Sequence, residues 1–182
     1  MIHPARADAL QVLTAWTPPD GQQSQLRDEY IDFLSVHDDA AERRNRIGHI
    51  TASALLMSPD GSEVLLTLHA RIGRWLQLGG HIEPSDATLV EAALREAREE
   101  SGMHDISIDP VPLRLDRHEV PCSNKRGGVD RLHHWDVQFL ARATHTLHSI
   151  SEESSDLAWW PVQGLPEVDS SVLALVAAAA RR

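Results

Sequence analysis

The sequence predicts an α/β protein in which a mixed sheet is covered by helices, with a helical extension ahead of the main domain. The length of 182 residues fits a single domain with a short appended element. Apolar residues make up 42% of the chain and charged residues 24%, which is typical of a soluble globular protein with a real core. The segments read as helices, a strand pair, a central helix, further strands and a closing helix. This order favours a sheet with helices packed on it.

Residues 1–46 are predicted to form two helices. The stretch from Arg6 to Trp16 is rich in Ala and Leu, and a Pro-Pro-Asp-Gly segment breaks it. The second helix is indicated by apolar side chains at i, i+4 and i+7, which are Leu26, Tyr30 and Phe33. We therefore place an N-terminal helical extension at residues 1–47 and the main domain at residues 48–182.

A strand pair is predicted directly after Gly48. The runs His49–Met57 and Glu63–Leu68 are strand-like, and the Ser-Pro-Asp-Gly segment between them has the chemistry of a hairpin turn. A shorter strand is predicted at Trp75–Leu78, ending in Gly79-Gly80.

The next element is a helix predicted over Leu89–Ser101. Thr88 and Glu91 have the spacing of a capping box at its start, and Gly102 is suited to end it. Asp86 is a rival N-cap, so two starting points fit the sequence.

The second half of the chain predicts three strand segments and a closing helix. The strands are expected at Ile106–Leu115, Leu132–Ala143 and Leu157–Pro161, with a loop rich in Gly and Arg at Ser123–Asp130. The Ala-rich segment Ser171–Ala180 predicts the last helix.

Charge and cysteine content narrow the class of protein. The chain has 17 Lys and Arg against 27 Asp and Glu, and a formal charge of −10 disfavours binding to nucleic acid or to an anionic membrane. Cys122 is the only cysteine in the sequence, so no intrachain disulfide is expected. The first residues have no apolar targeting segment, and the longest apolar run, Val172–Ala180, is too short to cross a bilayer. We therefore expect a cytoplasmic protein that binds neither nucleic acid nor membrane.

The predicted central helix carries three carboxylates on one face. At about 100° per residue, Glu96, Glu99 and Glu100 fall at i, i+3 and i+4. Like charges at this spacing destabilise a bare helix, whereas a divalent cation reverses the effect, and Mg²⁺ or Mn²⁺ prefers carboxylate oxygens. The alternative is a solvated acidic face in which Arg95 and Arg98 are ordinary ion-pair partners.

The segment around this helix resembles the signature of the Nudix hydrolases, G-x5-E-x7-R-E-U-x-E-E-x-G-U, where U is a bulky aliphatic residue. The chain has Gly80, then Asp86 after five residues, and then REAREESGM from Arg95 to Met103. Two features differ from the signature: Asp86 replaces the first glutamate, and one extra residue separates it from Arg95. Both fall in the loop or first turn, where an added residue leaves the glutamate face unrotated. The resemblance covers about residues 48–182.

This resemblance implies an α/β/α sandwich with a mixed sheet. It also implies hydrolysis of a pyrophosphate bond in a nucleoside diphosphate linked to another moiety, by water attack at phosphorus, with Mg²⁺ or Mn²⁺ as cofactor. The implied metal ligands are the Gly79 carbonyl, Glu96, Glu99 and Glu100. Arg95 would orient a catalytic carboxylate. The general base would be Glu99 or one of the pair Glu152 and Glu153.

Substrate-binding residues are harder to choose, and the candidates lie on the loops and strands around the predicted cleft. They are His81, Arg74, His118, His134, Asp136 and Arg126. Within the strand at Leu132–Ala143, His134 and Asp136 share one face, while His133 and Trp135 share the other. The spacing of the histidines matches no structural Cys and His zinc pattern.

Several of these residues also have a plainer interpretation. Lys125, Arg126 and Arg131 fit either contact with a terminal phosphate or solvated loop charge. Trp75 and Trp135 fit either stacking on a base or packing in the core.

Two other functions are compatible with the sequence. One is a Nudix-fold module that senses a nucleotide without hydrolysis, although such modules tend to lose their metal carboxylates, which are intact here. The other is an isomerase of related fold acting on a diphosphate. The N-terminal extension fits either a lid or a contact in a homodimer.

Overall fold

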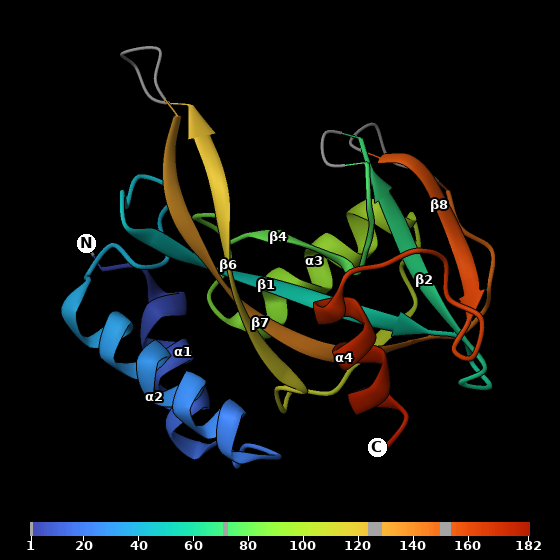
Figure 1. Ribbon diagram of the computed structural model, residues 1–182, viewed down its shortest axis with the longest axis horizontal. Helices are drawn as coiled ribbons and strands as arrows, with labels where there is room; N and C mark the ends of the chain where they lie inside the picture. Colours follow the sequence, from blue (N-terminus) through green and yellow to red (C-terminus); the bar gives the residue numbers. More distant parts are fainter. Residues whose placement is uncertain (1, 71–72, 124–128, 150–153) are drawn as a thin grey trace.

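The chain folds into one mixed sheet with helices on both of its faces (Figure 1). This computed structural model describes residues 2–70, 73–123, 129–149 and 154–182. The helices are α1 (Pro4–Ala15), α2 (Gly21–Val36), α3 (Leu89–Ser101) and α4 (Ser170–Ala179). The strands are β1 (Gly48–Met57), β2 (Glu63–His69), β3 (Trp75–Leu76), β4 (Leu78–His81), β5 (Ile106–Ile108), β6 (Arg114–Ser123), β7 (Val129–Ala143) and β8 (Ser154–Pro161).

Strand β1 is the centre of the sheet, and all 10 of its residues are buried. It runs parallel to β7, from Gly48 opposite His133 to Met57 opposite Arg142. On its other side it pairs antiparallel with β4 and, at its end, with β2. Strands β5 and β6 extend the sheet beyond β7, whereas β3 and β8 pair with β2. Parallel neighbours need a long crossover, and residues 58–128 form the connection between β1 and β7.

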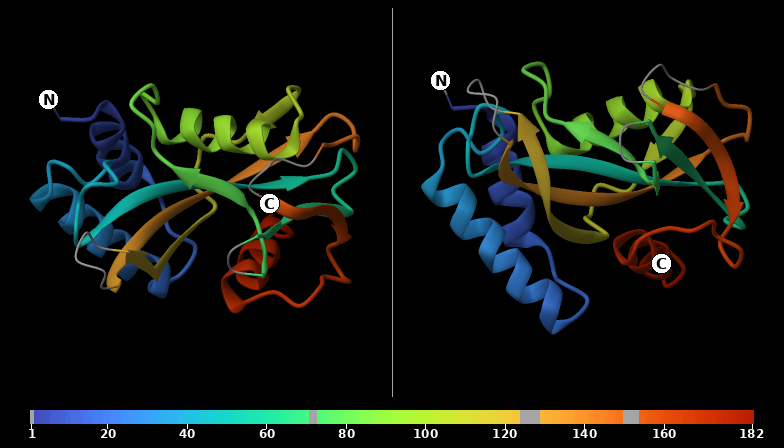
Figure 2. Two further views of the ribbon diagram at one scale, coloured as in Figure 1. Left: turned by 90° about the horizontal axis from the view of Figure 1, so that it is seen from above. Right: turned by 45° about the horizontal axis from the view of Figure 1, so that its top comes forward.

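The alternation of side chains along β1 assigns one helix to each face of the sheet. Ala54 packs in a cluster with Ala97 of α3, where two small side chains let helix and strand approach closely. The next residue, Leu55, packs in a cluster with Leu175 of α4. Figure 2 shows α3 and α4 on opposite sides of the sheet. These three layers confirm the predicted α/β/α sandwich with a mixed sheet.

The N-terminal helices share a core with the rest of the protein. Phe33 of α2 stacks on Trp135 of β7, with ring centroids 4.5 Å apart and planes 8° apart. The Gln23 side chain bonds both backbone groups of Leu115, donating to its carbonyl at 3.0 Å and accepting from its amide at 2.7 Å. The helical extension therefore packs against one end of the sheet, and its removal would expose buried aromatic rings.

The structure differs from the sequence prediction at three places. The loop predicted at Ser123–Asp130 is shorter, because β6 ends at Ser123 and β7 begins at Val129. The single strand predicted at Trp75–Leu78 is two strands, and β4 continues through both glycines to His81. The single strand predicted at Ile106–Leu115 is also two, β5 and β6, because Pro110 and Pro112 lie between them and have no N–H for the ladder.

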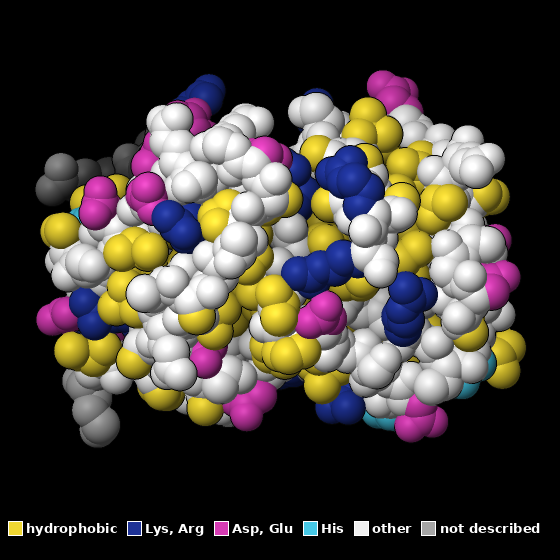
Figure 3. Space-filling view, turned by 90° about the horizontal axis from the view of Figure 1, so that it is seen from below, with side chains coloured by type: hydrophobic (Ala, Val, Ile, Leu, Met, Phe, Trp, Pro, Cys, Tyr) yellow, Lys and Arg dark blue, Asp and Glu magenta, His cyan; other side chains and the backbone are white. Residues whose placement is uncertain are grey.

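The surface does not carry its negative charge evenly. Figure 3 shows several Arg side chains gathered near the middle of the face seen from below, although Asp and Glu side chains outline much of its edge. One of the basic residues at the chain end, Arg182, is fixed by Asp109 at 2.8 Å and by the carbonyls of Val111 and Pro112. Among the described residues, no helix has the length and apolar content needed to cross a membrane.

Candidate active site

Helix α3 begins and ends where its local sequence directs. Thr88 accepts a hydrogen bond from the Glu91 amide at 3.1 Å, and the Glu91 carboxylate accepts from the Thr88 amide at 3.1 Å. This capping box confirms Thr88 as the N-cap, so the rival start at Asp86 is wrong. Gly102 ends the helix in the left-handed conformation, at φ 67°. Between these ends the helix presents Glu96, Glu99 and Glu100 at adjacent positions.

Two glycines of β4 let the helix carboxylates lie against the sheet. The Gly79 amide donates to Glu100 Oε2 at 3.2 Å. A Cβ on Gly80 would overlap the Glu96 carboxylate, at 2.7 Å from its Cδ. A Cβ on Gly79 would instead overlap Ser53 of β1, at 2.6 Å from its Cα. Glycine at position 80 therefore leaves room for the Glu96 carboxylate, whereas glycine at position 79 leaves room for the backbone of β1.

Arg95 organises the carboxylates around it. Its guanidinium donates to Asp86 at 2.9 and 3.2 Å, to Glu96 at 3.1 Å and to Glu99 at 3.0 Å. A further bond of 2.9 Å reaches the His81 carbonyl. These acceptors raise the pKa of Arg95 despite its burial, which acts to lower it. The side chain is 18% exposed and its donors are engaged within the protein. This arrangement suits a residue that positions carboxylates.

Asp86 does not cap α3 but forms an ion pair with Arg95. Its carboxylate is 5% exposed, binds Arg95, and accepts from the Glu83 amide at 2.8 Å. Burial acts to raise the pKa of Asp86, but the hydrogen bonds from Arg95 and from Glu83 outweigh it and hold that pKa below its ordinary value. Asp86 and Arg95 are thus paired although one residue more than in the signature separates them.

Replacing Asp86 by Asn is expected to lower the free energy of unfolding at pH 7 by about 1–3 kcal/mol, because the charge facing Arg95 is lost. A carboxyl whose folded pKa lies below its unfolded value stabilises the protein above the unfolded pKa, and the effect disappears as pH falls through the folded pKa. The stability difference between the two proteins should therefore narrow as the pH falls below the ordinary pKa of an aspartate side chain. Urea denaturation at pH 7 and at successively lower pH measures this difference.

The matched control for that experiment is Asp105→Asn, at an exposed position just beyond α3. This control should leave the free energy of unfolding almost unchanged at pH 7. An Asp86→Asn variant as stable as the parent protein at neutral pH would refute the structural role of the Asp86 and Arg95 pair.

The predicted substrate residues divide into several environments. His81 and His134 lie together on one face of the sheet, with ring centroids 5.0 Å apart. His118 is next to them, 5.5 Å from the His134 ring, and its Nδ1 lies 2.7 Å from Asp116. The hydrogen bond to Asp116 raises the pKa of His118 and burial opposes this effect. Arg74 is exposed and directly precedes β3.

Asp136 is not at the surface of a cleft. It is 4% exposed and accepts hydrogen bonds from Thr51 at 3.0 Å and from Ser53 at 2.6 Å. Burial raises the pKa of Asp136, and the bond from Ser53 opposes this. The carboxylate therefore joins β7 to β1 inside the sheet, and direct substrate contact by Asp136 remains a prediction.

The structure shows the contacts of three aromatic and basic candidates. Trp135 is 7% exposed and packed against the N-terminal helices, which agrees with the packing interpretation. Trp75 lies edge-on to Trp160 at 5.3 Å. Arg131 pairs with Glu119 at 2.8 Å on the protein surface. The remaining predicted residues, Lys125, Arg126, Glu152 and Glu153, lie outside the described residues.

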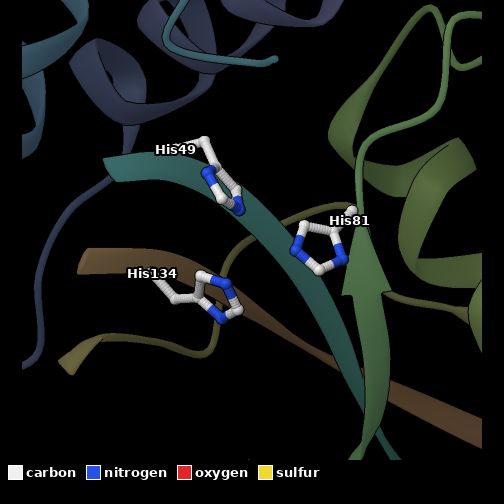
Figure 4. A group of neighbouring side chains, drawn as sticks. All are labelled: His49, His81 and His134. Atoms are coloured by element: carbon white, nitrogen blue, oxygen red, sulfur yellow. The ribbon is translucent and has the colours of Figure 1, made fainter. Parts of the chain in front are cut away.

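Sequence reasoning missed His49, which joins His81 and His134 (Figure 4). Burial lowers the pKa of His49 to about 4 and of His134 to about 3, and the Arg43 charge adds to the effect on both. His49 lies opposite His134 in the register of β1 and β7. This pairing is not visible in the sequence because the two residues are far apart along the chain.

The segment that carries this site matches a known protein family. The sequence matches the NUDIX domain over residues 48–179, which include β4, α3 and the histidine group. No curated protein matches the sequence closely enough to serve as a relative.

Solved structures with the same fold are distant in sequence. A hydrolase of the NUDIX family from Clostridium perfringens is 23% identical with a TM-score of 0.55, over 75% of this chain and 98% of that one. The NUDIX domain of Shewanella oneidensis NrtR, complexed with ADP ribose, is 22% identical with a TM-score of 0.54, over 83% and 96%. A MutT protein from Methanosarcina mazei Go1 is 18% identical with a TM-score of 0.54, over 75% and 96%. At these identities the likeness supports the fold.

Proposed function

The chain belongs to the Nudix hydrolase family, and from this premise we propose that it hydrolyses a pyrophosphate bond in a nucleoside diphosphate linked to another moiety, with a divalent cation. The observation that carries the proposal is the carboxylate face of α3 lying against the glycines of β4. Glu100 bonds the Gly79 amide, and Glu96 occupies the space that the missing Cβ of Gly80 leaves.

The residues present fit a hard divalent cation. Three carboxylates at adjacent positions of one helix supply oxygen ligands, which Mg²⁺ and Mn²⁺ prefer, and the Gly79 carbonyl is the proposed fourth ligand. The small space beside Gly80 supports this fit, because it brings Glu96 close to the backbone of β4. When bound, such an ion neutralises phosphate charge and acidifies water.

The protein's own groups would position the reacting carboxylates. Arg95 bonds Glu96 and Glu99 simultaneously, so it restricts the rotation of both side chains. Glu99 is 59% exposed, which leaves its carboxylate accessible for accepting a proton from water. We keep Glu99 and the pair Glu152 and Glu153 as the candidates for the general base.

The substrate class is proposed from the reaction and from the neighbouring residues. One protein of the same fold is a NUDIX domain complexed with ADP ribose, a nucleoside diphosphate linked to a sugar. His81 directly follows Gly80 along β4, and its ring lies 5.0 Å from that of His134. We keep both histidines as candidate substrate contacts. These observations support a small nucleotide-type substrate.

The experiment that tests this function is product release from a panel of compounds with Mg²⁺, with Mn²⁺ and with EDTA. The panel contains ADP-ribose, ordinary and oxidised nucleoside triphosphates, nucleotide sugars and dinucleotides. We expect metal-dependent turnover of one class. A chain that turns over none of these, while one of them raises its melting temperature, would instead be a binding module of the same fold.

A further inference from the structure

Three histidines from three neighbouring strands converge on one face of the sheet. His49 lies on β1, His81 on β4 and His134 on β7, and their rings turn toward a common space (Figure 4). One ring nitrogen of each lies within 4.8 Å of the others. The ring centroids are 4.9, 4.9 and 5.0 Å apart. The sheet therefore presents three nitrogen ligands from a rigid support.

The backbone register explains why the three rings meet. His49 is directly opposite His134 in the parallel pairing of β1 with β7. His81 is opposite Thr51 on the other side of β1, two residues from His49 and hence on the same face. Gly80 faces α3 and Glu96, so the next residue, His81, points to the opposite face. The histidine group and the α3 carboxylates thus lie on opposite faces of β4.

His49 gives an independent reason to expect a ligand. His49 is 4% exposed. Neither of its ring nitrogens has a hydrogen-bond partner among the described residues. Buried polar atoms are normally paired, and an unpaired one is unfavourable. A group bound between the three rings would satisfy the nitrogen that points toward His81 and His134.

We propose that His49, His81 and His134 form a second metal site, which takes Zn²⁺ or a similar borderline ion such as Co²⁺. Imidazole nitrogens suit zinc, whereas Mg²⁺ prefers oxygen, so this site and the α3 carboxylates select different ions. Three histidines leave one tetrahedral position for water or for an oxygen of a bound molecule. The site does not depend on the proposed hydrolysis.

The geometry and charge around the rings are compatible with such an ion. Zinc to nitrogen bonds of about 2.1 Å place two ligands about 3.4 Å apart, so nitrogens within 4.8 Å of each other approach by at most about 1.4 Å. The lowered pKa of His49 and of His134 keeps both rings neutral at pH 7, which is the form that binds metal. Arg43 is the positive charge that acts on these rings, and Asp116 provides a negative one beside His118.

The test is zinc binding by the full-length chain after treatment with a chelator, in excess Mg²⁺ so that the carboxylates of α3 are filled. Calorimetry with Zn²⁺ and visible absorption with Co²⁺ should each report one ion per chain. Loss of an outer-shell partner commonly weakens metal binding 10–100-fold, so His134→Gln, which removes a ligand, is expected to weaken it by more than about 100-fold.

Two control variants separate this site from its surroundings. His133 is the adjacent residue on the other face of β7, near Trp135, so His133→Gln should bind zinc as the parent chain does. Glu100→Gln should also bind it unchanged, because that side chain belongs to the α3 site. Zinc binding that survives in His134→Gln, or that is lost in Glu100→Gln, would overturn the proposal.

A second measurement covers the case in which a ligand variant folds poorly. His49→Leu removes two unpaired buried nitrogens, so its melting temperature without metal is expected to exceed that of the parent chain. Zinc should raise the melting temperature of the parent chain and leave that of His49→Leu unchanged. Stabilisation of the parent chain by inorganic phosphate and not by zinc would assign the rings and Arg43 to anion binding, and would refute the metal site.

Discussion

Replacing Glu100 by Gln is expected to reduce kcat/KM by about a hundredfold to a thousandfold, the range seen when a preorganised charge-stabilising group is removed. The amide oxygen of Gln can still accept from the Gly79 amide, so the contact between α3 and β4 survives. What is lost is the negative charge that the proposed cation needs. Steady-state kinetics on the substrate found in the panel, over a range of Mg²⁺ concentrations, measures the effect.

Glu91→Gln is the matched control, because it removes one charge from the same helix at the end away from the site. Gln also completes a capping box, so helix α3 should keep its start. We expect this control to have the kinetics and the melting temperature of the parent protein. Full turnover by Glu100→Gln would show that the carboxylate face of α3 does not bind the cation used in hydrolysis.

The neighbouring glycines are expected to respond differently to alanine. In Gly80→Ala the new Cβ occupies the position of the Glu96 carboxylate, which lies at the free end of a flexible side chain. The carboxylate is displaced and the backbone remains, so hydrolysis should fall about a hundredfold while the free energy of unfolding changes by less than about 1 kcal/mol. Activity and urea denaturation of the same preparation measure both quantities.

In Gly79→Ala the new Cβ meets β1 instead, including the Ser53 Cα and the Ala52 carbonyl at 2.9 Å. Backbone cannot move aside as a side chain does, so this variant should lose about 2–3 kcal/mol of stability. The two substitutions thus distinguish a loss of activity at the proposed site from a loss of stability of the sheet. Equal destabilisation by both substitutions would contradict the assignment of Gly80 to the site.

The ends of α3 and the positions of its three glutamates were predictable because their determinants are local. The capping box, Gly102 and the spacing of the three glutamates all lie within 15 residues, and helical geometry alone fixes their relation. The role of Asp86 was not predictable in the same way. Its pairing with Arg95 depends on the conformation of the loop between β4 and α3, and helical periodicity does not predict that conformation.

The group formed by His49, His81 and His134 was not predictable from sequence patterns alone. A strand pattern correctly separated His134 from His133, because alternation is a local property. It could not place His49 beside His134, since that contact depends on the register of two strands joined by most of the domain. Pro110 and Pro112 were visible in the sequence, yet the apolar residues on both sides of them made residues 106–115 look like one strand.

The parallel pairing of β1 with β7 also sets the order in which this protein assembles. Gly48 pairs with His133, so β1 cannot pair with β7 until the ribosome has synthesised most of the chain. At about 5–20 residues per second, translation of the intervening segment takes roughly 4–17 s. During that interval the most deeply buried strand lacks its partner, and such long-range pairing slows folding and exposes the chain to aggregation. Nascent chains of this protein should therefore be good clients of a chaperone that acts near the ribosome.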